Sequence, residues 1–237
     1  MTEKNTTAEF QSVMQMCREL FAKKLHDYGA AWRIMRPASI TDQLYIKANR
    51  IRSIEMKGEA KVDEGIVGEF IAIVNYGIVG QIQLDRGPAL SEGDMTPDEA
   101  LALYDQYARE ALELMLRKNH DYDEAWRSMR VSSYTDLILM KIFRTKQIED
   151  LEGQTLVSEG IAANYMDMIN YAVFGLIKLV VEAGEEQTER QVLGSLRELS
   201  FIGRFAPWFL VSGNPFGLPV SSQPSAASSI VLKQLRN

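Results

Sequence analysis

The sequence has very few of the residues that build disulfides or multi-histidine metal sites. One cysteine, Cys17, and two histidines, His26 and His120, occur among its 237 residues. A single cysteine cannot form an internal disulfide, so disulfide-stabilised folds and cysteine-rich zinc modules are excluded. Two histidines also exclude any metal site that needs three or more histidine ligands. The scarcity of cysteine favours a reducing compartment, and we expect a cytoplasmic protein.

Positive charge and long apolar runs are scarce as well. The formal net charge is −6, which disfavours direct binding of nucleic acid. The most apolar stretch, 161–181, is interrupted by Asn164, Asp167, Asn170 and Lys178, and these polar groups would be costly inside a bilayer. The N-terminus lacks the apolar segment of a secretory signal. We therefore expect no contact with membranes, while association into a homo-oligomer stays open.

The sequence repeats itself with a spacing of 94 residues. Residues 26–55 align with residues 120–149, and 15 of these 30 pairs are identical. A further shift of one residue aligns the Asn-Tyr pair at 75–76 with the pair at 170–171. Two copies are too few for a solenoid. The repeat therefore predicts two homologous units in a pseudo-twofold arrangement.

Helical periodicity dominates both units, and strand alternation is weak. The fold class predicted is an all-α helical bundle of two three-helix units. Thr96, Pro97 and Glu99 predict a helix start, with an N-cap, a proline at the first position and a capping glutamate. The expected helices run over about 8–25 and 97–119, then from after Ser39 and Ser133 to before Gly58 and Gly153, and finally over about 63–85 and 158–182.

The composition divides the chain into four parts. The first unit is expected at 1–86 and the second at 97–185, joined by a linker at 87–96 that is rich in glycine and proline. The last part, 186–237, is expected to hold a C-terminal helix and a flexible tail. From Ser200 onward it has four of the seven prolines and no acidic residue.

The motif His-Asp-Tyr-x-x-Ala-Trp-Arg-x-Met-Arg occurs in both units, between the first two expected helices. Loops on a rigid scaffold commonly carry binding groups. Guanidinium groups pair with phosphate oxygens, and aromatic rings stack on bases. Imidazole can exchange a proton near neutral pH. We predict catalytic roles for His26, Asp27, His120 and Asp121, and nucleotide contacts for Tyr28, Trp32, Arg33, Arg36, Tyr122, Trp126, Arg127 and Arg130.

The same motif has a structural interpretation, which stays open. The tryptophans would then pack into the core, and the arginines would pair with carboxylates. The second helices add Lys47 and Arg50, repeated as Lys141 and Arg144. A spacing of three residues puts each pair on one helix face, where two cations could hold a polyphosphate. A solvated face is the alternative for these cations.

Carboxylates also recur at equivalent positions of the two units. Glu55 and Glu149 lie near a helix C-terminus, where negative charge is disfavoured, so each needs a local partner or a metal. Mg²⁺ and Mn²⁺ prefer a few carboxylates plus phosphate oxygens. Glu64 and Glu159 are expected in a first helical turn, where the helix dipole favours an acid, so a structural role is the alternative to a metal for these two. We predict metal-ligand roles for Glu55, Glu64, Glu149, Glu159 and Asp167.

The pattern His-Asp-Tyr-Gly-x-Ala-Trp-Arg, followed by Ser-x-Thr-Asp, Lys-x-x-Arg and a helix with Asn-Tyr, resembles the nucleotide modification associated domain 1 family. Both units match it, over about 24–84 and 118–179. The resemblance implies a role near nucleotide or DNA-base modification. More distantly, the third helix of the second unit is similar to the metal-binding helix of all-α, MazG-like nucleoside triphosphate pyrophosphohydrolases. Here the Glu-x-x-Asp motif of those enzymes is split between Glu69 and Asp167.

Two hypotheses follow. The first is an all-α protein that binds a nucleoside phosphate and, in its extended form, hydrolyses it with Mg²⁺ or Mn²⁺. The second is a non-catalytic helical module whose duplicated motifs fix the helices together. Convergence of His26, Asp27, Arg33, Lys47 and Arg50 on an open cleft would favour the first, and an Asp27–Arg50 pair inside a closed core would favour the second.

Overall fold

The computed structural model describes residues 5–58, 65–91, 93–154 and 159–184, and within these ranges the chain is helical without a strand. The all-α prediction is confirmed. The described helices all belong to one compact unit of the chain. Glu64 and the tail expected at 186–237 lie outside the described residues. The first unit contains α1 (Thr6–Tyr28), η1 (Ala31–Ile34), α2 (Pro37–Lys57) and α3 (Ile66–Arg86), and the second contains α4 (Pro97–Tyr122), η2 (Ala125–Ser128), α5 (Val131–Asp150), α6 (Ile161–Leu176) and the π-helical η3 (Ile177–Glu182).

The start of α4 matches the capping pattern in the sequence. Thr96 Oγ1 accepts a hydrogen bond from the Glu99 amide at 3.3 Å, and Glu99 Oε2 accepts one from the Thr96 amide at 2.8 Å. These two bonds satisfy amides that have no partner inside the helix. Pro97 follows at the first helical position, where its missing N–H costs nothing.

The second helix of each unit begins earlier than predicted. It starts at Pro37 in α2 and at Val131 in α5, so the expected starts after Ser39 and Ser133 are wrong. Proline has a fixed φ that suits the first helical turn, which explains the start of α2. The third helix of the second unit begins later than predicted, at Ile161. Glu159 therefore precedes the N-cap Gly160 and is not part of the first turn of α6.

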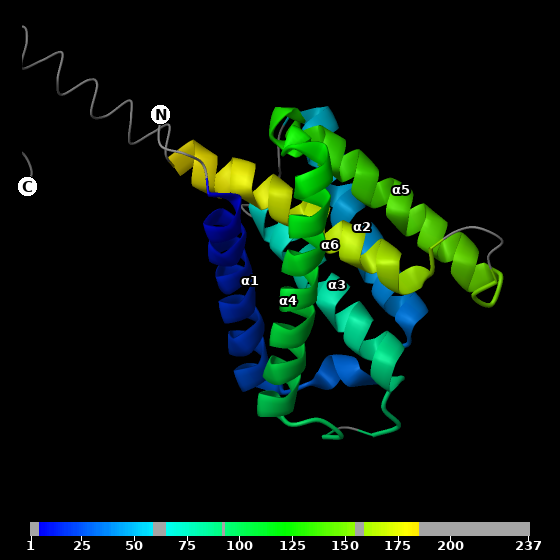
Figure 1. The fold of residues 1–237 in the computed structure, drawn as a ribbon. Helices are drawn as coiled ribbons and strands as arrows, with labels where there is room; N and C mark the ends of the chain where they lie inside the picture. The colour runs from blue at the N-terminus through cyan, green and yellow to red at the C-terminus, as the bar shows by residue number, and fades with distance from the viewer. Residues whose placement is uncertain (1–4, 59–64, 92, 155–158, 185–237) are drawn as a thin grey trace, which may run out of the picture. The chain divides into compact units, whose positions relative to one another are not determined.

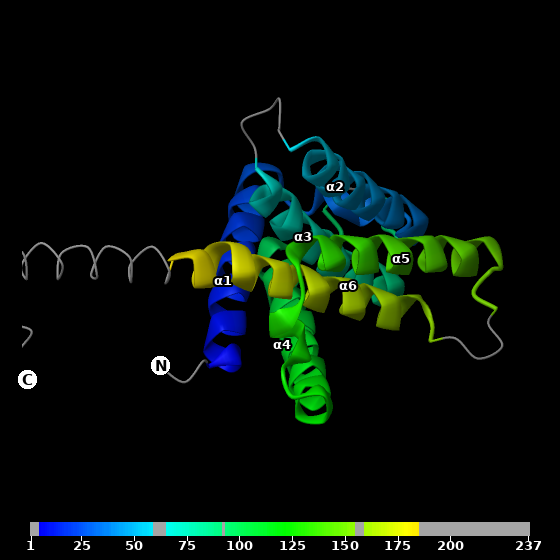
Figure 2. The same ribbon diagram turned by 90° about the horizontal axis from the view of Figure 1, so that it is seen from above.

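Each helix of the first unit packs against its own equivalent in the second. The helix α3 packs on α6, α2 on α5 and α1 against α4, while α2 and α5 also cover α3 and α6 within their units (Figures 1 and 2). This is the pairing that a pseudo-twofold axis generates, and the predicted arrangement is confirmed.

Side chains between α2 and α5 repeat the same symmetry. Thr41 Oγ1 donates to Glu149 Oε1 at 2.6 Å, and its equivalent Thr135 Oγ1 donates to Glu55 Oε1 at 3.0 Å. Two further ion pairs between the units are also equivalent. Lys146 pairs with Asp42 at 2.5 Å, and Arg52 pairs with Asp136 at 4.0 Å. The hydrogen-bond partners of both glutamates therefore lie in the opposite unit, and not close by on the same helix.

The central contact between α3 and α6 depends on glycine. A Cβ on Gly80 would lie 2.6 Å from the ring of Tyr165, and one on Gly77 would lie 2.6 Å from Ile169 Cγ1. The two helices approach each other closely because these side chains are missing. Among the described helices, α3 alone is long and apolar enough to cross a bilayer. Its place at the centre of the bundle, between α2 and α6, accounts for that apolarity.

Candidate functional site

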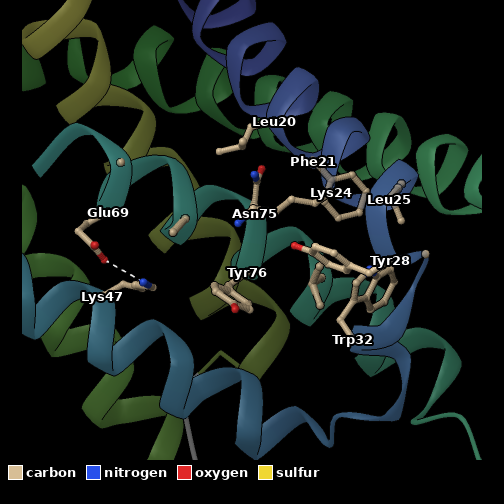
Figure 3. A pocket seen from close by; sticks show the side chains of 14 residues that line it. Leu20, Phe21, Lys24, Leu25, Tyr28, Trp32, Lys47, Glu69, Asn75 and Tyr76 are labelled. Atoms are coloured by element: carbon tan, nitrogen blue, oxygen red, sulfur yellow. Dashed lines mark ion pairs between the residues drawn. The ribbon is translucent and has the colours of Figure 1, made fainter. Parts of the chain in front are cut away.

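A cavity of about 520 Å³ lies in the first repeat, between α1, η1, α2 and α3 (Figure 3). Sites for small molecules commonly have volumes of roughly 300–1,000 Å³ and combine apolar walls with a few polar groups. Apolar side chains from α1 form part of its wall. The polar and aromatic residues that line the cavity are Lys24, Tyr28, Trp32, Lys47, Glu69, Asn75 and Tyr76.

The cavity has an aromatic end and a charged end. Figure 3 shows Tyr28 and Trp32 together at one side, Lys47 and Glu69 at the other, and Tyr76 between them. Tyr28 and Trp32 come from the predicted motif, and Lys47 comes from the predicted cationic face of α2. The fold therefore brings three of the predicted nucleotide contacts into one cavity.

Glu69 balances two cations at the charged end. Its side chain is only 3% exposed, Lys47 Nζ lies 3.3 Å from its Oε2, and Arg50 donates to its Oε1. A buried carboxylate needs such partners, because desolvation of an unpaired charge is costly. Lys24, by contrast, is exposed and makes no ion pair within the described part of the chain.

The hollow exists because the first repeat has smaller side chains than the second. Gly29, Gly68, Ala72 and Val79 line the cavity. Their equivalents in the second repeat are Asp123, Ala163, Asp167 and Phe174. The ring of Phe174 stacks on Trp126 with centroids 4.3 Å apart and planes 8° apart. Val79 has no ring to cover Trp32 in this way.

Two carboxylate–lysine pairs occupy the corresponding place in the second repeat. Lys118 Nζ lies 2.5 Å from Asp167 Oδ1, and Lys141 Nζ lies 2.6 Å from Asp167 Oδ2. Lys118 and Lys141 are the equivalents of Lys24 and Lys47. Both lysines thus share one carboxylate in the second repeat. In the first repeat both line the cavity, and Lys47 pairs with Glu69.

The structure places the motif arginines in two settings. The side chain of Arg33 is 5% exposed, donates to Gln83 and pairs with Asp94 at 2.9 Å. Arg127 pairs with Glu9, Glu124 and Glu182 at 2.5, 2.6 and 3.1 Å. These pairs are those that the structural interpretation of the motif expects. Arg36 and Arg130 are instead exposed at the N-caps of α2 and α5.

The predicted acid–base residues lie at the surface, in the last turns of α1 and α4. The side chains of His26 and His120 are 90% and 89% exposed, and each Nδ1 lies within 3.4 Å of the aspartate next in sequence. None of these four residues lines the cavity. Asp27 does not pair with Arg50 either. The catalytic roles of His26, Asp27, His120 and Asp121 stay predictions.

The remaining predicted contacts belong to the second repeat. Tyr122 is exposed, Trp126 is buried, and Arg144 is partly buried on α5. Lys141 is held by Asp167. The ring of Phe174 covers Trp126 in the second repeat, whereas Trp32 of the first repeat lines the cavity.

The predicted metal ligands are spread over the bundle. Burial raises the pKa of Glu55 and of Glu149, and the threonine hydrogen bond to each carboxylate partly opposes this. Asp167 is held by lysines, and Glu159 is exposed before α6. Within the described ranges, no three His, Cys, Asp or Glu side chains lie close enough to hold a metal ion. Glu64 is outside these ranges.

Lys24 is one of the cavity residues to which the sequence analysis assigned no role. It stands two residues before the motif, and a lysine stands at the equivalent position 118 of the second repeat. The presence of lysine at this position in both repeats could have identified Lys24 as a candidate.

The family described as nucleotide modification associated domain 1 matches residues 24–84 and 118–179. The two segments together cover just over half of the chain. The chain belongs to this family. Each copy of the nucleotide modification associated domain begins at the lysine two residues before the motif. The first copy ends in α3 and the second in η3. All the polar residues that line the cavity therefore fall inside the first copy. No curated protein and no solved structure matches the chain at a significant level.

Proposed function

We propose that the cavity of the first repeat binds a nucleotide. One observation carries the proposal. The aromatic residues Tyr28 and Trp32 line the same cavity as the two lysines, Lys24 and Lys47. Aromatic rings stack on any base, and lysine is a common partner of phosphate. Membership of a nucleotide-modification family supports the same ligand class.

Hydrolysis of the bound nucleotide is the extended form of this proposal. Mg²⁺ usually binds through one or two carboxylates together with substrate phosphates. Mg²⁺ or Mn²⁺ would accordingly arrive with the nucleotide. Glu69 is the carboxylate that lines the cavity, and it already pairs with Lys47 and Arg50. None of the predicted metal ligands among the described residues lines the cavity, so the residues present do not fit a metal site there. The general acid or base would come from the exposed His-Asp pairs, which must then approach the ligand.

A non-catalytic assembly module is the second candidate. It is favoured by Arg33 and Arg127, which tie the 3₁₀ turns η1 and η2 to carboxylates elsewhere in the bundle. This role accounts for much of the motif but not for the cavity.

Thermal unfolding with nucleoside mono-, di- and triphosphates, with and without Mg²⁺ or Mn²⁺, tests the proposal. At a ligand concentration of about 100 times Kd, we expect the best nucleotide to raise Tm by roughly 5–10 °C. The Lys47→Met variant should lose this shift. The matched Lys57→Met variant, an exposed lysine at the end of the same helix, should keep it.

The same measurements test nucleotide binding and nucleotide hydrolysis separately. Absence of any shift with all nucleotides would contradict nucleotide binding. Release of phosphate or pyrophosphate, measured in the same samples, separates hydrolysis from binding alone.

A further inference from the structure

The second repeat shows how its two lysines accommodate a negative group. Asp167 bridges Lys118 and Lys141, with one carboxylate oxygen for each ammonium group, at 2.5 and 2.6 Å. The carboxylate is 7% exposed and the Lys141 side chain is 10% exposed, whereas Lys118 is half exposed and reaches the carboxylate from the surface. Such charge-assisted contacts are short and strong.

The first repeat retains both lysines without this carboxylate. Ala72 stands at the position of Asp167, and Lys24 and Lys47 line the cavity that results. The acid of the first repeat is Glu69, one helical turn earlier on α3, where the second repeat has Asn164. Glu69 pairs with Lys47 and Arg50, and among the described ion pairs none joins it to Lys24. The place that the Asp167 carboxylate occupies in the second repeat therefore has no carboxylate in the first repeat.

We infer that the ligand of the cavity places one anionic group between Lys24 and Lys47, where the carboxylate of Asp167 lies in the second repeat. The kind of ligand, a nucleotide, is taken from the proposed function. The position of its anionic group comes from the comparison of the two repeats. The group must offer two oxygens to two ammonium groups within the space of one carboxylate. The phosphate monoester of a nucleoside monophosphate has this form.

The remainder of such a ligand fits the rest of the cavity. Tyr28 and Trp32 lie at the end away from Lys47 (Figure 3), where a base can stack on them. The second repeat already contains its own carboxylate, and Phe174 covers its tryptophan. We therefore expect the ligand at the first repeat and not at the equivalent place of the second, although the family domain occurs twice.

Exchange of residues between the repeats tests this position. Ala72→Asp supplies the carboxylate of the second repeat, and Ala72→Asn fills the same space without charge. The double variant Glu69→Asn/Ala72→Asp moves the acid by one turn at constant charge. The inverse pair Asn164→Glu/Asp167→Ala makes the matched change in the second repeat. Circular dichroism confirms that each variant is folded.

Isothermal titration with nucleoside monophosphates and with inorganic phosphate gives the readout. We expect one nucleotide per wild-type chain. Ala72→Asp and the double variant should bind at least roughly tenfold more weakly, Ala72→Asn should bind more tightly than Ala72→Asp, and the inverse pair should bind like the wild type.

The possible failures are distinguishable. If nucleotides bind Ala72→Asp as tightly as the wild type, or if Ala72→Asn weakens binding equally, the anion position is wrong while nucleotide binding stands. If the wild type binds inorganic phosphate in a manner sensitive to Ala72→Asp but binds no nucleotide, the position stands and the proposed function fails. If neither probe binds, both fail.

Discussion

Thr41 in the first repeat donates a 2.6 Å hydrogen bond to Glu149 in the second. The bond joins residues 108 positions apart and has a twofold equivalent on the other side of the axis. Burial raises the pKa of Glu149, and this hydrogen bond opposes the shift only in part. The interface between the repeats thus contains a carboxylate whose charged form is penalised by folding.

Replacement of Glu149 by glutamine should stabilise the protein at neutral pH. A carboxyl with a raised folded-state pKa binds more protons in the folded chain than in the unfolded chain, so stability falls as pH rises through that range. Glutamine keeps an acceptor for Thr41 without the charge. We expect a higher urea midpoint for Glu149→Gln at pH 7, and no difference below about pH 4, where the wild-type carboxyl is protonated in both states. Glu113→Gln, at an exposed position in the middle of α4, is the control and should leave the midpoint unchanged. A lower midpoint for Glu149→Gln at pH 7 would contradict the argument.

Tyr28 and Tyr122 occupy the same place in the two motifs but differ in their surroundings. Only Tyr28 lines the cavity of the first repeat. If its ring stacks on a base, Tyr28→Ala should weaken nucleotide binding roughly tenfold, because each stacked base contributes about 1–3 kcal/mol. Tyr122→Ala should leave the affinity unchanged. Equal effects of the two substitutions in a calorimetric titration would place the base elsewhere.

Arg33 should contribute to stability far more than Arg36. Arg33 is buried with Asp94 and Gln83, whereas Arg36 is exposed. Removal of one partner from a buried ion pair leaves the other charge uncompensated, so Arg33→Ala should lose about 3 kcal/mol in the free energy of unfolding. Arg36→Ala should stay within about 0.5 kcal/mol of the wild type. Urea unfolding of both variants checks this order, and a reversed order would show that the Arg33 network is not structural.

Cys17 should be inert in the folded protein. Burial raises the pKa of its thiol to about 12, and thiol reagents attack the thiolate. With a chromogenic disulfide reagent at pH 8, we expect labelling of the native chain only as fast as it unfolds. Ser12→Cys, at an exposed position of the same helix, should react at once. Rapid labelling of Cys17 without denaturant would contradict the burial of this thiol.

The repeat made most of the fold predictable from the sequence. Two copies of one pattern imply equivalent helices and a twofold relation between them, and Thr96 marked one helix start directly. The start of α2 was missed because the serine at 39 suggested an N-cap, whereas the preceding Pro37 already fits the first turn. Both residues are compatible with a helix start, and the sequence alone does not show at which of them the helix begins.

The site was only partly predictable, for two physical reasons. The partners of Arg33 stand 50 and 61 residues further along the chain, so its use in an internal ion pair depends on tertiary structure. The cavity is a lack of atoms at positions such as Gly29 and Ala72. Small residues carry no chemical signature by themselves, and they gain meaning here only through comparison with Asp123 and Asp167 in the other copy.

The pairing of α3 with α6 also governs how the chain acquires its structure during synthesis. Phe70 on α3 packs at Gly175, and Tyr165 lies over Gly80, yet α6 begins 95 residues after α3, at Ile161 against Ile66. Translation proceeds at roughly 5–20 residues per second. A newly made first repeat therefore exposes its most apolar helix to water, and to any chaperone at the ribosome, for roughly 5–20 seconds before α6 is synthesised.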